Sequence, residues 1–162
     1  MSAVLDLADL RALVAEVPDP ELPVLTIDDL GVLRDVVVDE SGRVTVTITP
    51  TYSGCPAMDA IAADVRTRLA VAGHSGADVR FVLSPAWTTE WMSEAGRRKL
   101  LEYGVAPPSP GVAGPVALTL SVRCPQCGSP DTGELSRFGS TACKALWRCR
   151  ACLEPFDRFK EH

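Results

Sequence analysis

The stretch VTVTITPTYSGCPAMDAIAADVRTRL, residues 44–69, changes its hydrophobic period part-way along. Its first six residues alternate apolar and threonine side chains, which predicts a half-buried β-strand over 44–49. From residue 56 apolar side chains recur every three or four positions, which predicts an amphipathic helix over 56–72. The apolar face of that helix consists of Met58, Ile61, Ala62, Val65 and Leu69. A strand followed directly by a helix indicates a mixed α and β domain.

The elements on either side of this stretch extend the same domain. Apolar side chains at helical spacing predict a helix over 10–17, which Pro18 ends because proline cannot continue a helix. The run 32–38 is expected to form a hairpin with 44–49 across the turn DESG. A strand at 79–83 and a helix at 92–103 complete an α-β-β-α-β-α order. We therefore predict a small α+β domain over residues 1–105.

The composition changes after this domain. The segment APPSPGVAGP, residues 106–115, contains four prolines, two glycines and no charged side chain, which is typical of a linker. Short strand-like runs separated by cysteine pairs follow the linker. Residues 116–162 are therefore predicted to form a zinc-ribbon mini-domain.

The overall composition excludes several classes of function. The chain has 162 residues, of which 46% are hydrophobic, and its net charge of −5 argues against a nucleic-acid partner. No apolar run approaches the ~18–20 residues of a membrane span, and the first residues lack the basic start of a signal peptide. We expect a cytoplasmic protein without a membrane partner. In that reducing compartment, paired cysteines are more often metal ligands or redox groups than disulfides.

Two C-x-x-C pairs lie in the C-terminal segment. They are CPQCG at 124–128 and CRAC at 149–152, with 21 residues between Cys127 and Cys149. Each pair brings two thiolates within reach of one metal ion, and two pairs complete a tetrahedron. The predicted ligands are Cys124, Cys127, Cys149 and Cys152. A closed site of this kind is structural, and zinc is favoured over iron because nothing else in the sequence indicates electron transfer.

Cys143 is a fifth cysteine in the same region. It is either an ordinary strand residue, a spare ligand or a transfer thiol beside the metal site. The neighbouring Lys144 would favour its thiolate form.

Cys55 has no other cysteine near it in the sequence. Pro56 suits the first turn of a helix, so Cys55 is expected at or beside the N-cap of the helix that follows. Free N–H groups and the helix dipole at that position would lower the pKa of the thiol. The alternative is a small buried cysteine between a strand and a helix. A cysteine hydrolase is not expected, because His74 lies about 27 Å away at the far end of the helix.

Two further groups of side chains have alternative interpretations. The loop DPELPVLTIDDLG, residues 19–31, is either a solvated acidic loop or a carboxylate cluster, and the solvated loop is favoured. Trp87 and Trp91 can share a face and serve either as core residues or as a docking edge for a partner.

Three segments resemble a known family. VPDPELPVLTIDDLGVLRDV, TYSGCPAMDAI and LSPAWTTEWMSEAGRRKL are similar to the α+β domain of iron–sulfur cluster assembly adaptors. The family motifs match Asp19, Pro20, Glu21 and Pro23, then Gly54, Cys55 and Pro56, and finally Trp87. With the ribbon CPQCGS…CKALWRCRACLEPFDRFK, the chain resembles the PaaD family over about residues 10–160. PaaD proteins, also called PaaJ, are components of phenylacetyl-CoA epoxidase (phenylacetate-CoA oxygenase) systems.

The resemblance implies an accessory role in aerobic phenylacetate degradation. The partners it implies are a diiron oxygenase and a reductase that carries flavin and an iron–sulfur cluster, and the implied task is maturation of a metal centre, foremost the reductase's cluster. It also implies that Cys55 is the functional thiol, which transiently binds iron or a cluster or holds a client. Asp19, Glu21, Trp87 and Cys143 are auxiliary candidates.

No catalytic constellation is predicted in the chain. It contains neither a Glu-x-x-His set for a diiron site nor a glycine-rich dinucleotide motif. Two alternatives to a maturation factor remain open: a non-catalytic structural subunit of the oxygenase, and a small rubredoxin-like redox protein. An exposed hairpin edge would permit a homodimer.

Overall fold

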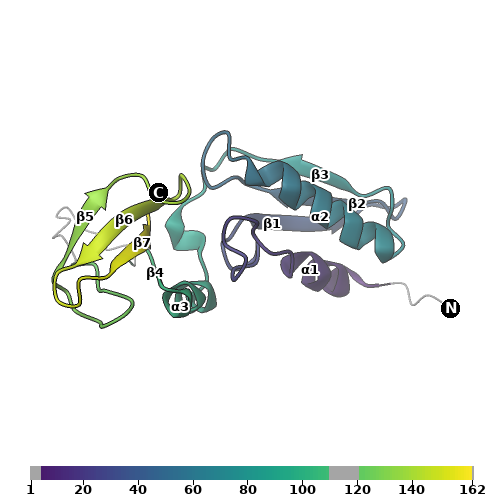
Figure 1. Cartoon of the computed structure of the whole chain (residues 1–162). Coiled ribbons are helices and arrows are strands. Elements are labelled where there is room, and N and C mark those ends of the chain that lie inside the picture. Colours follow the sequence, from purple (N-terminus) through teal and green to yellow (C-terminus); the bar gives the residue numbers. More distant parts are fainter. Residues whose placement is uncertain (1–4, 110–120, 162) are drawn as a thin grey trace. The chain divides into compact units, whose positions relative to one another are not determined.

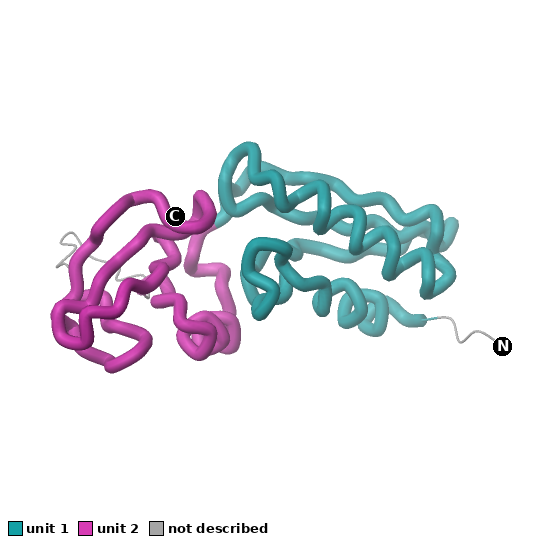
Figure 2. The backbone as a smooth tube through the Cα atoms, viewed as in Figure 1, with its two compact units in different colours: residues 1–87 teal, residues 88–162 magenta. Residues whose placement is uncertain are grey.

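The computed structural model describes residues 5–109 and 121–161. The chain divides into two compact units, residues 1–87 and residues 88–162 (Figure 2). Helices and strands occur in both units, so the predicted α+β class is confirmed. Within the described residues, no helix combines the length and the apolar character needed to span a bilayer.

The first unit is a three-stranded sheet with two helices (Figure 1). Its elements are α1 (Leu7–Ala15), β1 (Leu33–Val38), β2 (Val44–Ile48), α2 (Ala57–Val71) and β3 (Asp78–Phe81). The strand order is β1-β2-β3, in which β1 and β2 are antiparallel and β2 and β3 are parallel. Helix α2 therefore makes the crossover connection that a parallel strand pair requires.

The periodicities in the sequence account for the core of this unit. In β2 the side chains of Val44, Val46 and Ile48 are buried, and the threonines between them are partly exposed. The predicted hairpin and the predicted helix over 56–72 are confirmed within one residue at each end. Helix α1 starts three residues before the predicted helix at 10–17, because Asp6 forms a capping box with Asp9.

The second unit contains a 3₁₀ turn, an α-helix and a four-stranded sheet. Its elements are the 3₁₀ turn η1 (Thr89–Trp91), α3 (Glu94–Tyr103), β4 (Val105–Ala106), β5 (Thr132–Ser136), β6 (Lys144–Cys149) and β7 (Pro155–Phe159). The strand order is β4-β7-β6-β5, with β4 parallel to β7 and the other pairs antiparallel. Helix α3 ends at Gly104, which adopts a left-handed conformation with φ 90°.

The boundary between the units differs from the sequence expectation. A division after residue 105 is expected, but the units divide between Trp87 and Thr88. The physical reason is β4, which pairs with β7 and so joins the segment that follows α3 to the ribbon. Ala106, the first residue of the expected linker at 106–115, is buried in this strand, and residues 110–115 lie outside the described residues.

Trp87 is a core residue of the first unit. Its side chain is buried, and its indole Nε1 donates a hydrogen bond of 2.8 Å to the carbonyl oxygen of Leu30. This bond joins the end of the unit to the loop that precedes β1. Of the two interpretations of the tryptophan pair, core packing holds for Trp87, whereas Trp91 in η1 is partly exposed.

We expect Trp87→Phe to lower the free energy of unfolding of the first unit by about 1–3 kcal/mol. The substitution keeps an aromatic ring but leaves the buried carbonyl of Leu30 without its indole donor. Chemical denaturation followed by circular dichroism measures the change. Val71→Thr is the control, since Val71 is 87% exposed and its substitution should stay within about 0.5 kcal/mol. A Trp87→Phe protein as stable as the wild type would show that the hydrogen bond from Trp87 to Leu30 does not stabilise the unit.

Candidate functional site

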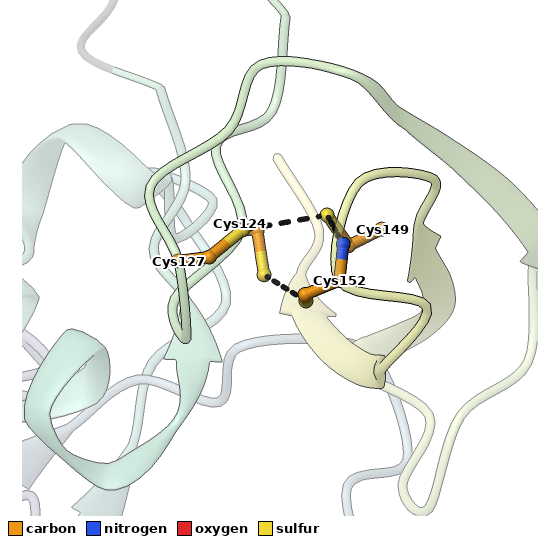
Figure 3. Close-up of side chains that lie close together, drawn as sticks. All are labelled: Cys124, Cys127, Cys149 and Cys152. Carbon is orange, nitrogen blue, oxygen red and sulfur yellow. Dashed lines mark hydrogen bonds between the residues drawn. The ribbon is translucent and has the colours of Figure 1, made fainter.

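Four cysteine sulfurs lie together in the second unit (Figure 3). The Sγ atoms of Cys124, Cys127, Cys149 and Cys152 are all within 4.8 Å of one another. The Sγ–Sγ distance is 3.7 Å between Cys124 and Cys152, and 3.6 Å between Cys127 and Cys149. Tetrahedral coordination with metal–sulfur bonds of ~2.3 Å would separate neighbouring sulfurs by about 3.8 Å. The arrangement of the donor atoms therefore fits four thiolates around one metal ion.

The two cysteine pairs lie on turns of the same construction, which we call the first knuckle (residues 123–129) and the second knuckle (residues 148–154). In each, the N–H of the first cysteine donates to the carbonyl five residues later, at 3.0 Å: Cys124 to Ser129, and Cys149 to Glu154. In each, the arginine before that cysteine donates to the carbonyl of the residue after the second cysteine, at 3.1 Å: Arg123 to Gly128, and Arg148 to Leu153.

The thiols of the cluster do not ionise independently. The pKa of Cys149 is lowered to about 7, because the backbone N–H of Cys152 donates to its Sγ at 3.4 Å. The pKa of Cys152 is raised to about 12: the N–H of Glu154 favours its thiolate, but burial and the neighbouring sulfurs of Cys149, Cys127 and Cys124 outweigh that bond. Because each thiolate disfavours the next, four of them require a cation among them.

Buried apolar side chains lie around the sulfurs. Ala106, Val122 and Phe156 are buried there with Cys124 and Cys149, and Trp147 and Cys152 pack against them partly exposed. Because a preformed metal site is absent from the unfolded chain, metal binding at these sulfurs would add to the folding free energy.

Cys143 lies outside the four-sulfur cluster. Its side chain is buried, and its Sγ is 3.0 Å from the hydroxyl oxygen of Thr141. The buried amine of Lys144 donates to the Ser140 hydroxyl at 2.9 Å and lies 3.9 Å from a carboxylate oxygen of Asp157. The charge of Lys144 is thus balanced by Asp157, which weakens the argument that Lys144 activates Cys143.

In the first unit, Cys55 lies immediately before α2, as expected. Pro56 is the N-cap residue and Ala57 begins the helix, so Cys55 precedes the cap. Its carbonyl accepts the N–H of Met58 at 3.3 Å, and the thiol is half-buried. Gly54 before it has φ 79°, and a Cβ built there would meet nothing within 4 Å. Glycine is therefore required by the backbone conformation at this turn and not by crowding.

The expected lowering of the Cys55 pKa is wrong. Burial raises the pKa of this thiol above its usual value, although the N–H of Ala57 and the side chain of Tyr52 oppose the shift. The negative charges of Glu21 and Asp19 raise it further. The thiol is therefore protonated at neutral pH. Tyr52 is not among the residues expected at the site, and its only signal in the sequence is its position three residues before the cysteine.

The acidic loop is also different from the favoured expectation. Asp19 and Asp29 are buried, so two of its carboxylates are not solvated. Asp19 Oδ1 accepts the N–H groups of Glu21 and Leu22 at 2.9 and 2.8 Å, and Asp29 Oδ2 accepts the N–H of Thr26 at 3.1 Å. These carboxylates cap backbone turns, and the turn at Asp19 holds Glu21 within electrostatic range of Cys55.

Both units contain residues that match known protein families. Residues 109–160 match the PaaD zinc beta ribbon domain, and residues 7–81 match the iron–sulfur cluster assembly protein family. An Escherichia coli K12 protein named as a 1,2-phenylacetyl-CoA epoxidase subunit is 48% identical over 152 residues, which cover 94% of this chain and 91% of that protein. This chain belongs to the PaaD family.

Two further relatives each match less than two thirds of this chain. An iron–sulfur protein maturation auxiliary factor of Porphyromonas gingivalis is 39% identical over 97 residues, which cover 59% of this chain and 89% of that factor. A crystal structure of a domain of unknown function from Bacillus anthracis superposes with a TM-score of 0.54 at 33% identity, covering 58% of this chain and 90% of that one. Cys55, Asp19 and Glu21 lie in the part matched to the assembly family.

We expect Glu21→Gln to lower the pKa of Cys55 and to speed its alkylation by iodoacetamide at pH 8, by roughly two- to five-fold. Removing one negative charge favours the thiolate, which is the reactive form. Mass spectrometry of the peptide that contains Cys55 measures the rate. Glu40→Gln, in the turn between β1 and β2, is the control and should leave the rate unchanged.

The raised pKa of the Cys55 thiol also predicts how the stability of the fold changes with pH. The protonated thiol is the form that the fold favours, so its contribution to stability is complete below the ordinary thiol pKa and is lost as the pH rises through the raised pKa. An alkylation rate for Cys55 at pH 8 above that of a free model thiol would contradict this direction.

Proposed function

We propose that this protein is an accessory maturation factor of a phenylacetyl-CoA epoxidase system, and that it assists assembly of an iron–sulfur cluster on the reductase. The observation that carries the proposal is the combination in one chain of an assembly-type α+β unit, with Cys55 at its helix start, and a four-cysteine ribbon. A relative that covers 94% of this chain bears the name of an epoxidase subunit, and a relative that covers 59% of it bears the name of a maturation factor.

In this proposal Cys55 is the thiol that acts on the cargo. Thiolate is the ligand that iron–sulfur clusters use, and Cys55 is the one cysteine of the first unit. Its half-buried position keeps the sulfur accessible, while burial and the nearby carboxylates keep it protonated until a cation takes the place of the proton. Glu21 and Asp19 are auxiliary because their charge would attract an incoming cation.

We further propose that Cys124, Cys127, Cys149 and Cys152 hold zinc in a closed structural site. A zinc ion would balance thiolates that disfavour one another and would stabilise the ribbon. Backbone N–H donors directed at the sulfurs, such as the N–H of Gln126 at 3.4 Å from Cys124 Sγ, suit a permanently ionised site.

A constitutive, non-catalytic subunit is the second candidate, because the relative of the whole chain is named as a component of the epoxidase itself. Co-purification at fixed stoichiometry with the oxygenase would favour that candidate. A transient association that ends when the reductase carries its cluster would favour maturation.

We expect Cys124→Ser to remove most of the bound metal and to unfold the ribbon, because three thiolates and a hydroxyl bind a metal ion far less tightly than four thiolates. The wild type should contain about one metal ion per chain by elemental analysis, and the protein should be colourless if the ion is zinc. Cys143→Ser is the matched control, since Cys143 lies outside the cluster and its loss should leave the metal in place. Retention of metal by Cys124→Ser would refute the ligand set.

We expect Cys55→Ala to leave the fold intact and to remove most of the cluster from a reductase co-expressed with it. The iron and sulfide content of the purified reductase, with its visible absorbance, measures the loss. Cys143→Ser again serves as the control. Full cluster loading in the presence of Cys55→Ala would sink the proposed role of Cys55, and a Cys55→Ala protein that fails to fold would assign this cysteine to structure.

A further inference from the structure

An arginine spans each cysteine pair of the ribbon. Arg123 and Arg148 each precede the first cysteine of a knuckle, and each donates at 3.1 Å to the carbonyl of the residue after the second cysteine. The donor is Nη1 in Arg123 and Nε in Arg148. The same contact at the same spacing in two separate turns indicates that it belongs to the construction of the knuckle and is not a chance position of an exposed side chain. We call these two bonds the arginine latches.

Each latch closes the loop that carries two of the four sulfurs. Next to it, the N–H of the first cysteine donates to the carbonyl of the next residue at 3.0 Å, so that two bonds join the start of the loop to its end. Within the closed loops, the N–H of Gln126 donates to Cys124 Sγ at 3.4 Å, and the N–H of Cys152 donates to Cys149 Sγ at 3.4 Å. Moving one sulfur of a pair away from the other therefore requires the latch to open. Contacts of this kind orient the ligands, and metal affinity commonly falls when they are lost.

The two knuckles are not equally secure at the residue that accepts the latch. Gly128 accepts it in the first knuckle, has φ 74°, and also donates its N–H to the carbonyl of Cys124 at 2.8 Å. Leu153 accepts it in the second knuckle at φ 68°, a conformation that costs free energy for leucine. Among the residues that the structure describes, the N–H of Leu153 makes no equivalent bond. The second knuckle thus combines a strained backbone with fewer bonds, and its latch carries a larger share of the closure.

We propose that Arg123 and Arg148 are positioning residues for the four-cysteine site, which hold its two loops closed, and that the second knuckle is the one that opens when metal leaves. The inference deepens the proposed function, because it rests on the proposed metal site of the ribbon. Loss of the ion requires one loop to open before the other, and the less secure loop, which carries Cys149 and Cys152, opens first.

The test measures how fast the full-length, zinc-loaded protein transfers its metal to an excess of a chromophoric chelator. Arg148→Met removes the donor but keeps a long side chain, so it should speed metal transfer by roughly five- to ten-fold. Arg123→Met should speed it by about two-fold, since the bond from Gly128 still closes the first knuckle. Arg148→Lys keeps a donor on a long side chain and should stay within about two-fold of the wild type, because the latch is a single bond and not a bidentate pair.

Arg150→Met is the matched control. Arg150 lies in the second knuckle, between Cys149 and Cys152, and carries the same charge as Arg148, but its guanidinium pairs with Asp131 at 3.3 Å and forms no latch. This variant should transfer metal at the wild-type rate. The comparison therefore separates the loss of a hydrogen bond from the loss of a positive charge near the thiolates.

Three results would each overturn the proposal. The first is metal transfer from Arg148→Met that is no faster than from Arg150→Met. The second is transfer from Arg148→Lys that is as fast as from Arg148→Met, which would exclude a role for the donor. The third is faster transfer from Arg123→Met than from Arg148→Met. If Arg148→Met does not fold, equal rates for Arg123→Met and Arg150→Met reject the latches.

Metal content distinguishes failure of this proposal from failure of the proposed function. A wild-type protein purified without bound metal would reject the ribbon site and the latches with it. One metal ion per chain in every variant, with equal transfer rates, would reject the latches and retain the site. Neither result bears on Cys55, whose role is measured by cluster loading of the reductase.

Discussion

Four sulfurs packed within 4.8 Å of one another are the constraint on which the second unit depends. Thiolates at such distances repel: although the N–H of Glu154 favours the thiolate of Cys152, burial and the sulfurs of Cys149, Cys127 and Cys124 raise its pKa to about 12. A cation among the four sulfurs would convert this repulsion into a stabilising interaction of the second unit. The pairing of β4 with β7 joins the segment after α3 to this sheet.

The features that the sequence predicts well are those that depend on near neighbours along the chain. The alternation of Val44, Val46 and Ile48 requires one buried strand face, and the C-x-x-C spacing requires two sulfurs on one turn. The two-residue strand β4 has no such pattern, because it exists only through its pairing with β7. A proline-rich segment therefore resembles a linker from its first residue, although Ala106 is buried in a sheet.

The pKa of Cys55 likewise could not be predicted from its near neighbours in the sequence. Its position before α2 follows from Pro56, and a helix start by itself favours a thiolate. The raised pKa comes instead from burial and from Glu21 and Asp19, which belong to a loop more than 30 residues earlier in the chain. Asp19 reaches that place because it caps a turn, which a count of acidic residues cannot reveal. Electrostatics at a site is thus a property of the tertiary structure even where the local geometry is correctly predicted.

The first and second knuckles can be compared directly, because they share one construction. Arg123 and Arg148 make the same hydrogen bond in the two turns, and the first cysteine of each turn donates to an equivalent carbonyl. The common construction of the two turns suits coordination of one metal ion by both. It cannot account for a leucine at the position where the other turn has glycine, since the backbone requirement there favours glycine in both. The side chain of Leu153 is 60% exposed, so packing in the core does not explain it either.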